Sequence, residues 1–203
     1  MIVIKLTDKN KREVIEQTVA ALIEGKTVVY PTETFYGLGS VAGNIKAVRK
    51  IYLIKGRTVN KALPFLLANR QMAKRYLKFN STAFRLARKY WPGPLSLVLP
   101  TTIYGRRLLG GEDAGVRISS NKFATKLVQT LGQPLISTSA NPSGRPAAAS
   151  ATKTIKYFSG RRHKPDLIID AGRLPKSKGS TFVKLIGKEV VVLREGDISL
   201  KIK

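Results

Sequence analysis

The sequence of 203 residues has no cysteine and a single histidine, His163. Disulfide bonds, thiolate metal sites and histidine-rich zinc sites are therefore excluded because the ligands are missing. A serine nucleophile activated by histidine is also disfavoured, because His163 lies in the basic run Arg161-Arg162-His163-Lys164, which we expect to face water. The lack of cysteine agrees with an intracellular compartment.

Acidic residues are scarce and unevenly placed. The chain has 37 Lys and Arg against 12 Asp and Glu, which gives a formal net charge of +25. Between Thr34 and Pro165 only Glu112 and Asp113 are acidic. Paired-carboxylate hydrolysis and protein metal cages therefore have few candidate residues, and we predict no metal ligands. The charge suits anionic substrates, but an unusual host proteome or nonspecific RNA adhesion explains the bulk of it equally well.

The chain also lacks long apolar runs. No segment approaches the roughly 20 consecutive apolar residues of a membrane span, and charge enters the N-terminus at Lys5, too early for a signal-peptide core. We therefore expect a soluble, cytoplasmic protein with no membrane partner. Because 43% of the residues are hydrophobic and no repeat or linker divides the chain, residues 1–203 are expected to form one domain.

Alternating helical and strand patterns predict an α/β fold. Helices are expected at 10–24, 44–55, 69–77, 81–90, 122–131 and 149–158, and strands at 2–5, 27–30, 63–67, 95–99, 114–118, 134–137, 166–170, 181–185 and 189–194. The last two strands flank Gly187 and predict a hairpin, so we expect a twisted mixed β-sheet flanked by helices. Four aromatic residues at helical or turn spacing are expected in the core: Phe79, Phe84, Tyr90 and Trp91.

Ligands of such sheets bind at strand ends, and three segments there carry suitable side chains. The first is the loop Pro31-Thr32-Glu33-Thr34-Phe35-Tyr36-Gly37-Leu38-Gly39, whose glycines let another group come close to the backbone. Such a loop binds an anion or forms a tight structural turn. We expect the segment Lys55-Gly56-Arg57 at a solvent-facing helix end, where the helix dipole favours cations with or without a ligand. The glycine lets both cations converge on one anion, and Lys61 follows close behind. Ser137-Thr138-Ser139-Ala140-Asn141-Pro142-Ser143-Gly144 offers hydroxyls and an amide, a composition that ordinary loops share.

Taken in order, these segments and four more resemble the YrdC-like domain family, whose members include L-threonylcarbamoyladenylate synthases. The further segments are Trp91-Pro92-Gly93-Pro94, Val116-Arg117, Ser180-Thr181 and Arg194-Glu195-Gly196. The resemblance covers nearly the whole chain. It implies a YrdC-like fold with a concave basic face, in its single-domain form because the chain stops soon after Gly196.

The resemblance also implies an activity and a site. The chain would be a nucleotidyltransferase that makes threonylcarbamoyl-AMP and pyrophosphate from ATP, L-threonine and bicarbonate, for threonylcarbamoyladenosine modification of tRNA. A threonylcarbamoyl transferase complex would receive the product, and Mg²⁺ would bind mainly to the ATP phosphates. Residues around ATP would be Lys55, Arg57, Lys61, Ser139, Asn141 and Arg194, of which Lys55 and Arg57 would be catalytic. Residues around L-threonine would be Thr34, Arg117, Ser137 and Ser180.

Four positions depart from the family pattern and keep alternatives open. Thr58 stands where proline is common, Leu66 where histidine is common, and Ser119 and Asn121 where proline and histidine are common. A paralogue with another amino-acid substrate, or without turnover, would fit these departures. A second alternative is an RNA-binding module that grips tRNA or double-stranded RNA without synthase activity. The hydroxyl-rich loops favour the enzyme, since backbone binding needs only distributed Lys and Arg, and RNA binding is then expected to be weak.

Overall fold

The computed structural model describes residues 1–58 and 62–200. These residues form a mixed α/β fold, which confirms the predicted fold class. The helices are α1 Lys11–Ile23, α2 Ile45–Lys55, α3 Arg70–Tyr76, α4 Ser81–Tyr90, α5 Ile103–Leu109, α6 Lys122–Leu131 and α7 Ala151–Phe158. The strands are β1 Ile2–Lys5, β2 Val28–Tyr30, β3 Gly37–Gly39, β4 Phe65–Leu66, β5 Leu95–Pro100, β6 Asp113–Arg117, β7 Leu135–Ile136, β8 Thr138–Ser139, β9 Leu167–Asp170, β10 Thr181–Ile186 and β11 Glu189–Arg194. Within these two ranges, no helix is long and apolar enough to span a bilayer.

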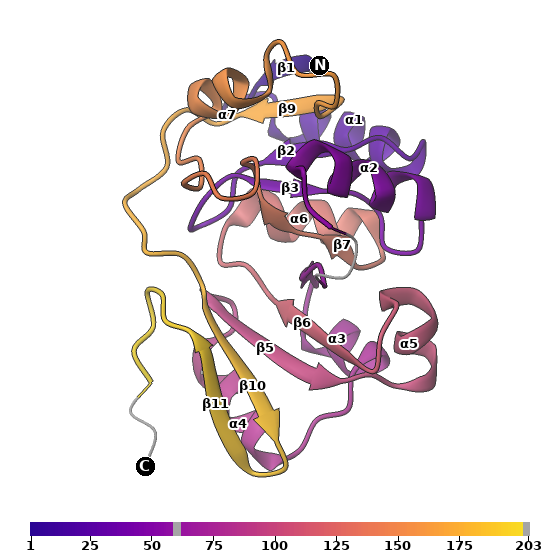
Figure 1. The fold of residues 1–203 in the computed structure, drawn as a ribbon, viewed down its shortest axis with the longest axis vertical. Coiled ribbons are helices and arrows are strands. Elements are labelled where there is room, and N and C mark those ends of the chain that lie inside the picture. The colour runs from indigo at the N-terminus through magenta and orange to yellow at the C-terminus, as the bar shows by residue number, and fades with distance from the viewer. Residues whose placement is uncertain (59–61, 201–203) are drawn as a thin grey trace.

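The strands form two mixed sheets, where the sequence led us to expect one. The first has the order β1-β9-β2-β3-β8 and the second the order β11-β10-β5-β6-β4-β7. Figure 1 shows α1, α2 and α7 with the first sheet and α3, α4 and α5 with the second. The hairpin of β10 and β11 around Gly187 is confirmed. Hydrophobic patterns mark strands but not their partners, so the division into two sheets was not predictable.

Asparagine side chains explain why most helix starts were predicted within a residue or two. Asn44, Asn69, Asn80 and Asn121 each precede a helix, and each side chain accepts a hydrogen bond from a backbone N–H three residues later, over 2.7–3.1 Å. Such caps satisfy donors that have no partner within the helix. Gly56 ends α2 in the left-handed conformation, with φ of 58°, where glycine carries no steric penalty.

Three elements were missed, two because they contain glycine and one because it is very short. Strand β3 contains two glycines, and it forms because β2 and β8 pair with it on either side. A Cβ on Gly39 would collide with the carbonyl oxygen of Ile136, so only glycine fits there. Helix α5 contains Gly105, which passes against the main chain of Tyr76 and lowers helix propensity. Strand β8 has only two residues.

The expected aromatic core is correct for Trp91 and wrong for Phe84. Trp91 is buried, and Phe79 and Tyr90 are partly buried against the core. Phe84 is 42% exposed. Its ring lies 5.1 Å from that of Phe79 and 5.0 Å from the ammonium of Lys74. The exposed face of α4 therefore carries an aromatic ring shielded by neighbours rather than by the core.

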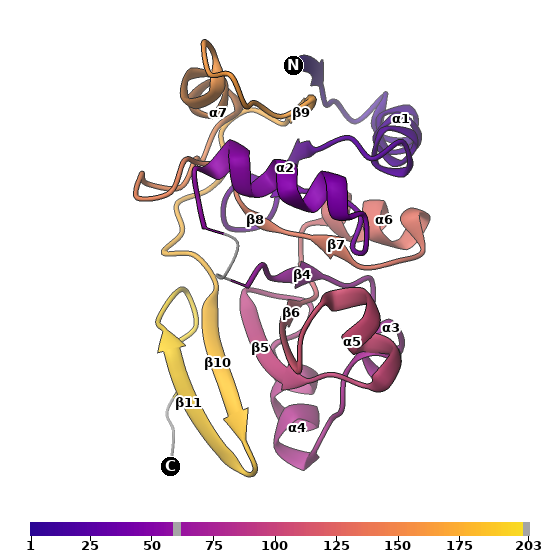
Figure 2. The ribbon, with the colours of Figure 1, turned by 45° about the vertical axis from the view of Figure 1, so that its right-hand side comes forward.

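The chain passes between the two sheets at three places. Residues 40–64 lead from β3 through α2 to β4, Ser137 separates β7 from β8, and residues 171–180 lead from β9 to β10. Figure 2 shows the long connector to β10 running beside the junction of the two halves. Motifs that are far apart in the sequence therefore meet between the sheets.

Candidate active site

A cavity of about 750 Å³ lies where these crossing segments meet. Nine predicted site residues line it: Thr34, Lys55, Arg57, Arg117, Ser137, Ser139, Asn141, Ser180 and Arg194. Lys61, the remaining predicted residue, lies outside the described residues. The structure brings the nine together from six parts of the chain, while their individual roles toward ATP and L-threonine stay predictions.

Cations dominate the charge of this cavity. Five cationic side chains line it: Lys55, Arg57, Arg117, Lys178 and Arg194. Among the described residues, no Asp or Glu lines it. Hydroxyl groups of threonines and serines supply much of the remaining polar surface. This combination suits a ligand that carries several negative charges and also needs directional hydrogen bonds.

Lys55 is buried, which corrects the expectation of a solvent-facing helix end. The residue is 4% exposed, and its ammonium donates to the carbonyl oxygens of Ser139 at 2.6 Å and Asn141 at 2.9 Å. Burial, followed by repulsion from Arg57, lowers the pKa of Lys55 to about 8. Lys55 therefore organises the Ser139–Asn141 segment and also keeps a charge that no carboxylate pairs among the described residues.

Two polar atoms on the cavity wall have no partner within the described residues. The Asn141 amide nitrogen donates to the carbonyl oxygens of Pro142 and Arg145, which closes a turn. Its oxygen Oδ1 is buried without a hydrogen bond, and so is Nε of Arg57. Buried polar groups are nearly always satisfied. One acceptor and one donor of residues that line this end of the cavity are thus buried without a hydrogen-bond partner in the described chain.

Arg117, the last residue of β6, forms an ion pair with Glu33 from the loop between β2 and β3. The two side chains are 10% and 13% exposed. Ser119 donates a hydrogen bond to the second carboxylate oxygen of Glu33. Because β2 and β6 belong to different sheets, this group of three residues joins the two halves beside the cavity.

The departures at Ser119 and Asn121 thus have structural roles in this chain. Ser119 binds Glu33 through its hydroxyl, and Asn121 caps α6. Leu66 is buried and forms part of the cavity wall, which makes that wall apolar at a position where a histidine was expected from the family pattern.

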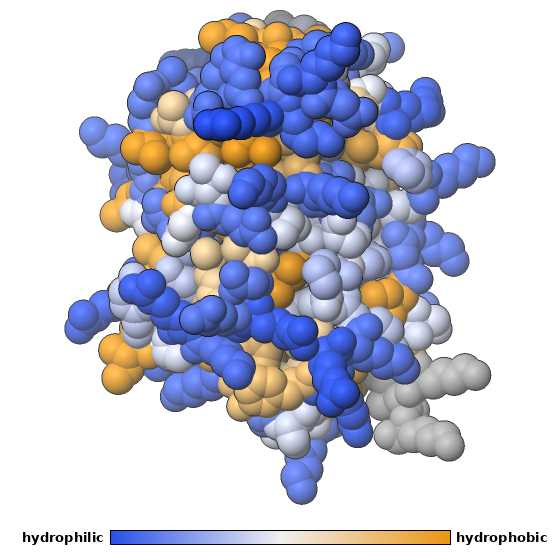
Figure 3. All heavy atoms as spheres, turned by 180° about the vertical axis from the view of Figure 1, so that it is seen from behind, coloured by the Kyte–Doolittle hydropathy of each residue, from blue (hydrophilic) through white to orange (hydrophobic). Residues whose placement is uncertain are grey.

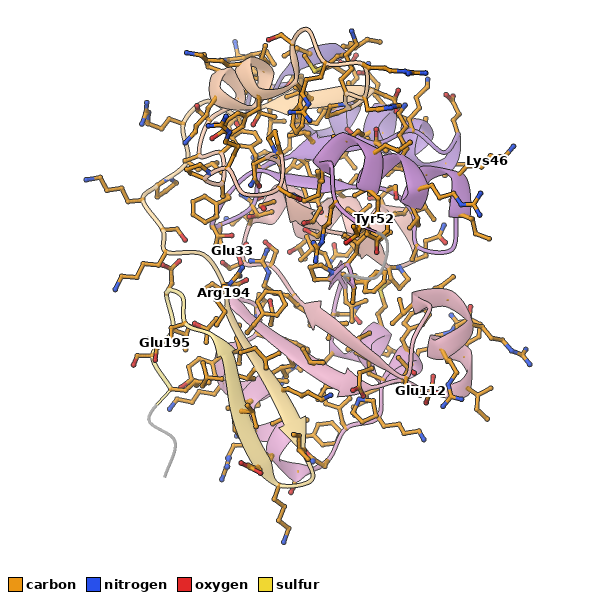
Figure 4. The ribbon with its side chains drawn as sticks, in the orientation of Figure 1. Glu33, Lys46, Tyr52, Glu112, Arg194 and Glu195 are labelled. Carbon is orange, nitrogen blue, oxygen red and sulfur yellow. The ribbon has the colours of Figure 1, made fainter. Side chains whose placement is uncertain are left out.

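Arg194 links the two predicted groups of ligand-binding residues. Its Nη2 donates to the carbonyl oxygen of Ser180 at 2.8 Å and to its hydroxyl at 3.0 Å. The guanidinium lies 4.7 Å from the ring of Phe182. Burial, and then the charge of Arg117, lower the pKa of Arg194. Figure 4 shows Glu33 and Arg194 at the level between the two sheets. A residue assigned to ATP therefore contacts one assigned to L-threonine.

Sequence reasoning missed Lys178 and Phe182, which also line the cavity. Both flank Gly179-Ser180-Thr181, of which the family resemblance covered only Ser180-Thr181. Gly179 has φ of 95°, and a Cβ there would lie 3.2 Å from the ring of Phe35. A glycine between a cation and a serine at the start of a strand was therefore the available clue.

Comparisons with known proteins agree on one family. Residues 20–196 match the model of the Sua5/YciO/YrdC family, whose description reads "Telomere recombination". The threonylcarbamoyl-AMP synthase of Pyrococcus abyssi is 37% identical over 200 residues, which is 95% of this chain and 58% of that protein. The crystal structure of P. abyssi Sua5 complexed with L-threonine is 34% identical and superposes with a TM-score of 0.88, over 97% of this chain and 58% of that one.

A second solved structure, E. coli YciO, matches along nearly its full length. It is 28% identical, with a TM-score of 0.84, and the match covers 98% of this chain and 97% of that one. By contrast, the chain spans only 58% of the P. abyssi protein. The fold is therefore shared with relatives of different lengths.

Proposed function

The chain belongs to the Sua5/YciO/YrdC family, and we propose that it is an L-threonylcarbamoyladenylate synthase that converts L-threonine, bicarbonate and ATP into threonylcarbamoyl-AMP and pyrophosphate. One observation carries the proposal: a single cavity joins unpaired cations and unsatisfied polar atoms with a hydroxyl-rich wall around a paired arginine. The unpaired cations and unsatisfied polar atoms suit a polyphosphate. The hydroxyl groups and the paired arginine suit a zwitterion. The P. abyssi relatives, named as a synthase and as a complex with L-threonine, support the same function.

ATP is assigned to the cationic side of the cavity. Lys55 and Arg57 place positive charge beside the phosphates, where it stabilises the charge that moves onto the leaving pyrophosphate. Asn141 Oδ1, buried and without a partner among the described residues, accepts a hydrogen bond from an N–H or O–H of the nucleotide. Ser139 and Arg194 complete this side.

L-threonine is assigned to the side that holds Arg117. Arginine binds carboxylates through parallel N–H groups, and the hydroxyls of Thr34, Ser137 and Ser180 offer hydrogen bonds to the other polar groups of the amino acid. In the reaction, the threonine amine bonds to the bicarbonate carbon and water leaves, giving a carbamate. A carbamate oxygen then attacks the α-phosphorus of ATP, and pyrophosphate leaves. The protein aligns three reactants and supplies no nucleophile.

Magnesium is proposed to arrive with ATP. The described cavity residues offer hydroxyls, amides and cations but no carboxylate, and no group of three metal-ligating His, Cys, Asp or Glu exists among the described residues. This donor set does not fit a protein-held Mg²⁺ site, since Mg²⁺ prefers carboxylate and phosphate oxygens. The phosphates of ATP and water would provide its ligands.

The partners we propose follow from the product and the charge. We propose that a threonylcarbamoyl transferase complex that modifies tRNA consumes the threonylcarbamoyl-AMP, and that the enzyme acts in the cytoplasm. The net charge of +25 favours weak, salt-sensitive RNA binding without sequence preference. Figure 3 shows hydrophilic side chains over much of one face of the molecule. The concave basic face stays a prediction.

Pyrophosphate release tests the synthase directly. We expect release with ATP and magnesium only when both L-threonine and bicarbonate are present. Each would be omitted in turn, and the product would be identified by mass spectrometry. Equal release without L-threonine would contradict the proposal and would favour the paralogue with another substrate.

Asn141→Ala separates the enzyme from an RNA-binding module. Loss of the Oδ1 acceptor and of the turn that the amide nitrogen closes is expected to abolish adenylate formation. RNA affinity should hardly change, because a neutral amide contributes little to counterion release. A filter-binding titration across salt on the same variant checks this. Selective RNA binding that survives physiological salt, with no turnover in the wild type, would establish the module instead.

A further inference from the structure

Arg117 is fixed from both sheets. Its main chain pairs in β6 with β4, where Leu66 lies opposite it, and its carbonyl oxygen accepts a hydrogen bond from Leu67 N–H at 2.9 Å. Its side chain is held by Glu33, from the loop that joins β2 and β3 of the other sheet. The guanidinium thus has little freedom to rotate, although it lines the cavity.

Glu33 and Ser119 act from behind this guanidinium. Neither is among the residues that line the cavity. One Glu33 oxygen accepts from Arg117 and the other from Ser119. Ser119 is 1% exposed and is itself held, because its carbonyl oxygen accepts from the Thr125 hydroxyl at 2.6 Å. Both carboxylate oxygens of Glu33 are therefore used to fix neighbours rather than to meet a ligand.

We propose that Glu33 and Ser119 are positioning residues that orient Arg117 to receive the carboxylate of the amino-acid substrate. The inference rests on the proposed function, since it names how that site recognises L-threonine. An arginine has five N–H donors in a rigid fork. Glu33 takes up Nη1, which leaves other donors of the fork for the substrate.

The ion pair also sets the charge of this end of the cavity. With Glu33 paired to it, Arg117 binds a carboxylate by directed hydrogen bonds and adds little net positive charge. A zwitterionic amino acid, which has no net charge, suits such a site better than a second polyanion does. The unpaired Lys55 and Arg57 do the opposite on the nucleotide side.

The chain offers a matched control outside the cavity. Asp166 accepts from the Lys50 ammonium at 2.6 Å through one oxygen and from the Thr27 hydroxyl at 2.9 Å through the other. This arrangement of cation, carboxylate and hydroxyl resembles that of Arg117, Glu33 and Ser119, although Lys50 and Asp166 are more exposed and Asp166 also accepts from the Thr27 backbone N–H. None of its three residues lines the cavity. Asp166→Asn therefore removes a comparable carboxylate without touching the proposed site.

The test compares Glu33→Gln, Ser119→Ala and Asp166→Asn with wild type. Pyrophosphate release is measured while L-threonine or ATP is varied, and L-threonine binding is measured by calorimetry. We expect Glu33→Gln to raise the KM and Kd for L-threonine about tenfold and Ser119→Ala about threefold. The KM for ATP and kcat should stay within about twofold in both. Asp166→Asn should leave both KM values unchanged.

The outcomes separate this inference from the proposed function. If the wild-type protein binds L-threonine but releases no pyrophosphate, the proposed synthase activity is contradicted. Weaker L-threonine binding in Glu33→Gln would still support the positioning role of Glu33. An unchanged L-threonine KM and Kd in folded Glu33→Gln overturns the inference. The inference is also overturned if Glu33→Gln raises the KM for L-threonine and the KM for ATP equally. The same holds if Asp166→Asn weakens L-threonine binding as much as Glu33→Gln does, or if the wild type does not bind L-threonine. If Glu33→Gln does not fold, Ser119→Ala decides by the same criteria.

Discussion

Lys55 and Arg117 are both buried cations of one cavity, but the protein stabilises their charges differently. Lys55 donates to two carbonyl oxygens, and its pKa is lowered to about 8. Arg117 is paired with the Glu33 carboxylate. Carbonyl dipoles leave the Lys55 charge uncompensated, whereas Glu33 compensates that of Arg117. Burial alone therefore does not say what a cation binds; its partners do.

The difference matches the chemistry of the two proposed reactants. An uncompensated ammonium gains most from a polyphosphate, because the low dielectric of the site strengthens their attraction. A compensated guanidinium still offers oriented N–H groups, which suits the carboxylate of a zwitterion. The difference between Lys55 and Arg117 can be tested by replacing either residue and by following the effect of pH on Lys55.

Removing Arg117 should have the largest effect on stability. Arg117→Met leaves the Glu33 carboxylate buried without its cation, which costs about 3–5 kcal/mol of unfolding free energy when a buried pair is broken. Glu33→Gln/Arg117→Met removes both charges and should recover most of that loss. Urea unfolding of wild type and of both variants at neutral pH measures it. A double variant as unstable as Arg117→Met would show that the pair is not the cause.

Removing Lys55 should cost less stability but much activity. Lys55→Met removes the hydrogen bonds from the ammonium to the carbonyl oxygens of Ser139 and Asn141, at about 1–3 kcal/mol of unfolding free energy. The Ser139 oxygen keeps the hydrogen bond from the Asn141 backbone N–H. Pyrophosphate release should fall by about 10-fold to 150-fold, the value of one charge-assisted phosphate contact. Lys46→Met is the control, because Lys46 lies on the same helix and points away from the cavity (Figure 4). Comparable losses in both variants would reject a special role for Lys55.

The fold was predictable where local chemistry decides it. Asparagine caps and Gly56 fix helix ends without reference to the rest of the chain. Strands β3 and β8 depend on partners that are remote in sequence, since Gly37 pairs with Ser139. The same long-range pairing divides the strands into two sheets, and no single-sequence pattern encodes it.

The site shows the same division. The motifs identified which residues gather at the cavity, because polar loops at strand ends meet there. They did not reveal that Lys55 is buried against the Ser139–Asn141 segment. They also did not reveal the ion pair of Glu33 and Arg117, whose partners are 84 residues apart. Burial and pairing depend on tertiary structure, and these two properties distinguish the roles of the cations.

The smallest expected effect is a pH dependence that only the uncompensated cation should show. With a pKa of about 8, the charged fraction of Lys55 falls from about nine-tenths at pH 7 to about one-tenth at pH 9. The Kd for ATP should rise about tenfold over that range. Calorimetry with ATP and magnesium, without L-threonine, avoids the separate titration of the substrate amine. The Kd for L-threonine, which depends on the paired Arg117, should not follow this curve once the amine is accounted for.

Stability should move in the opposite direction to ATP affinity. Folding lowers the pKa of Lys55 from 10.5 to about 8, so between these values the unfolded chain holds more protons than the folded one. The contribution of Lys55 to the unfolding free energy therefore rises as pH increases through this window. Arg57 is the charged neighbour that contributes to this lowered pKa. Lys55→Met should lose both trends, with a flat ATP Kd between pH 7 and 9. A variant that keeps the wild-type ATP curve would place the titrating group elsewhere and remove the distinction between the two cations.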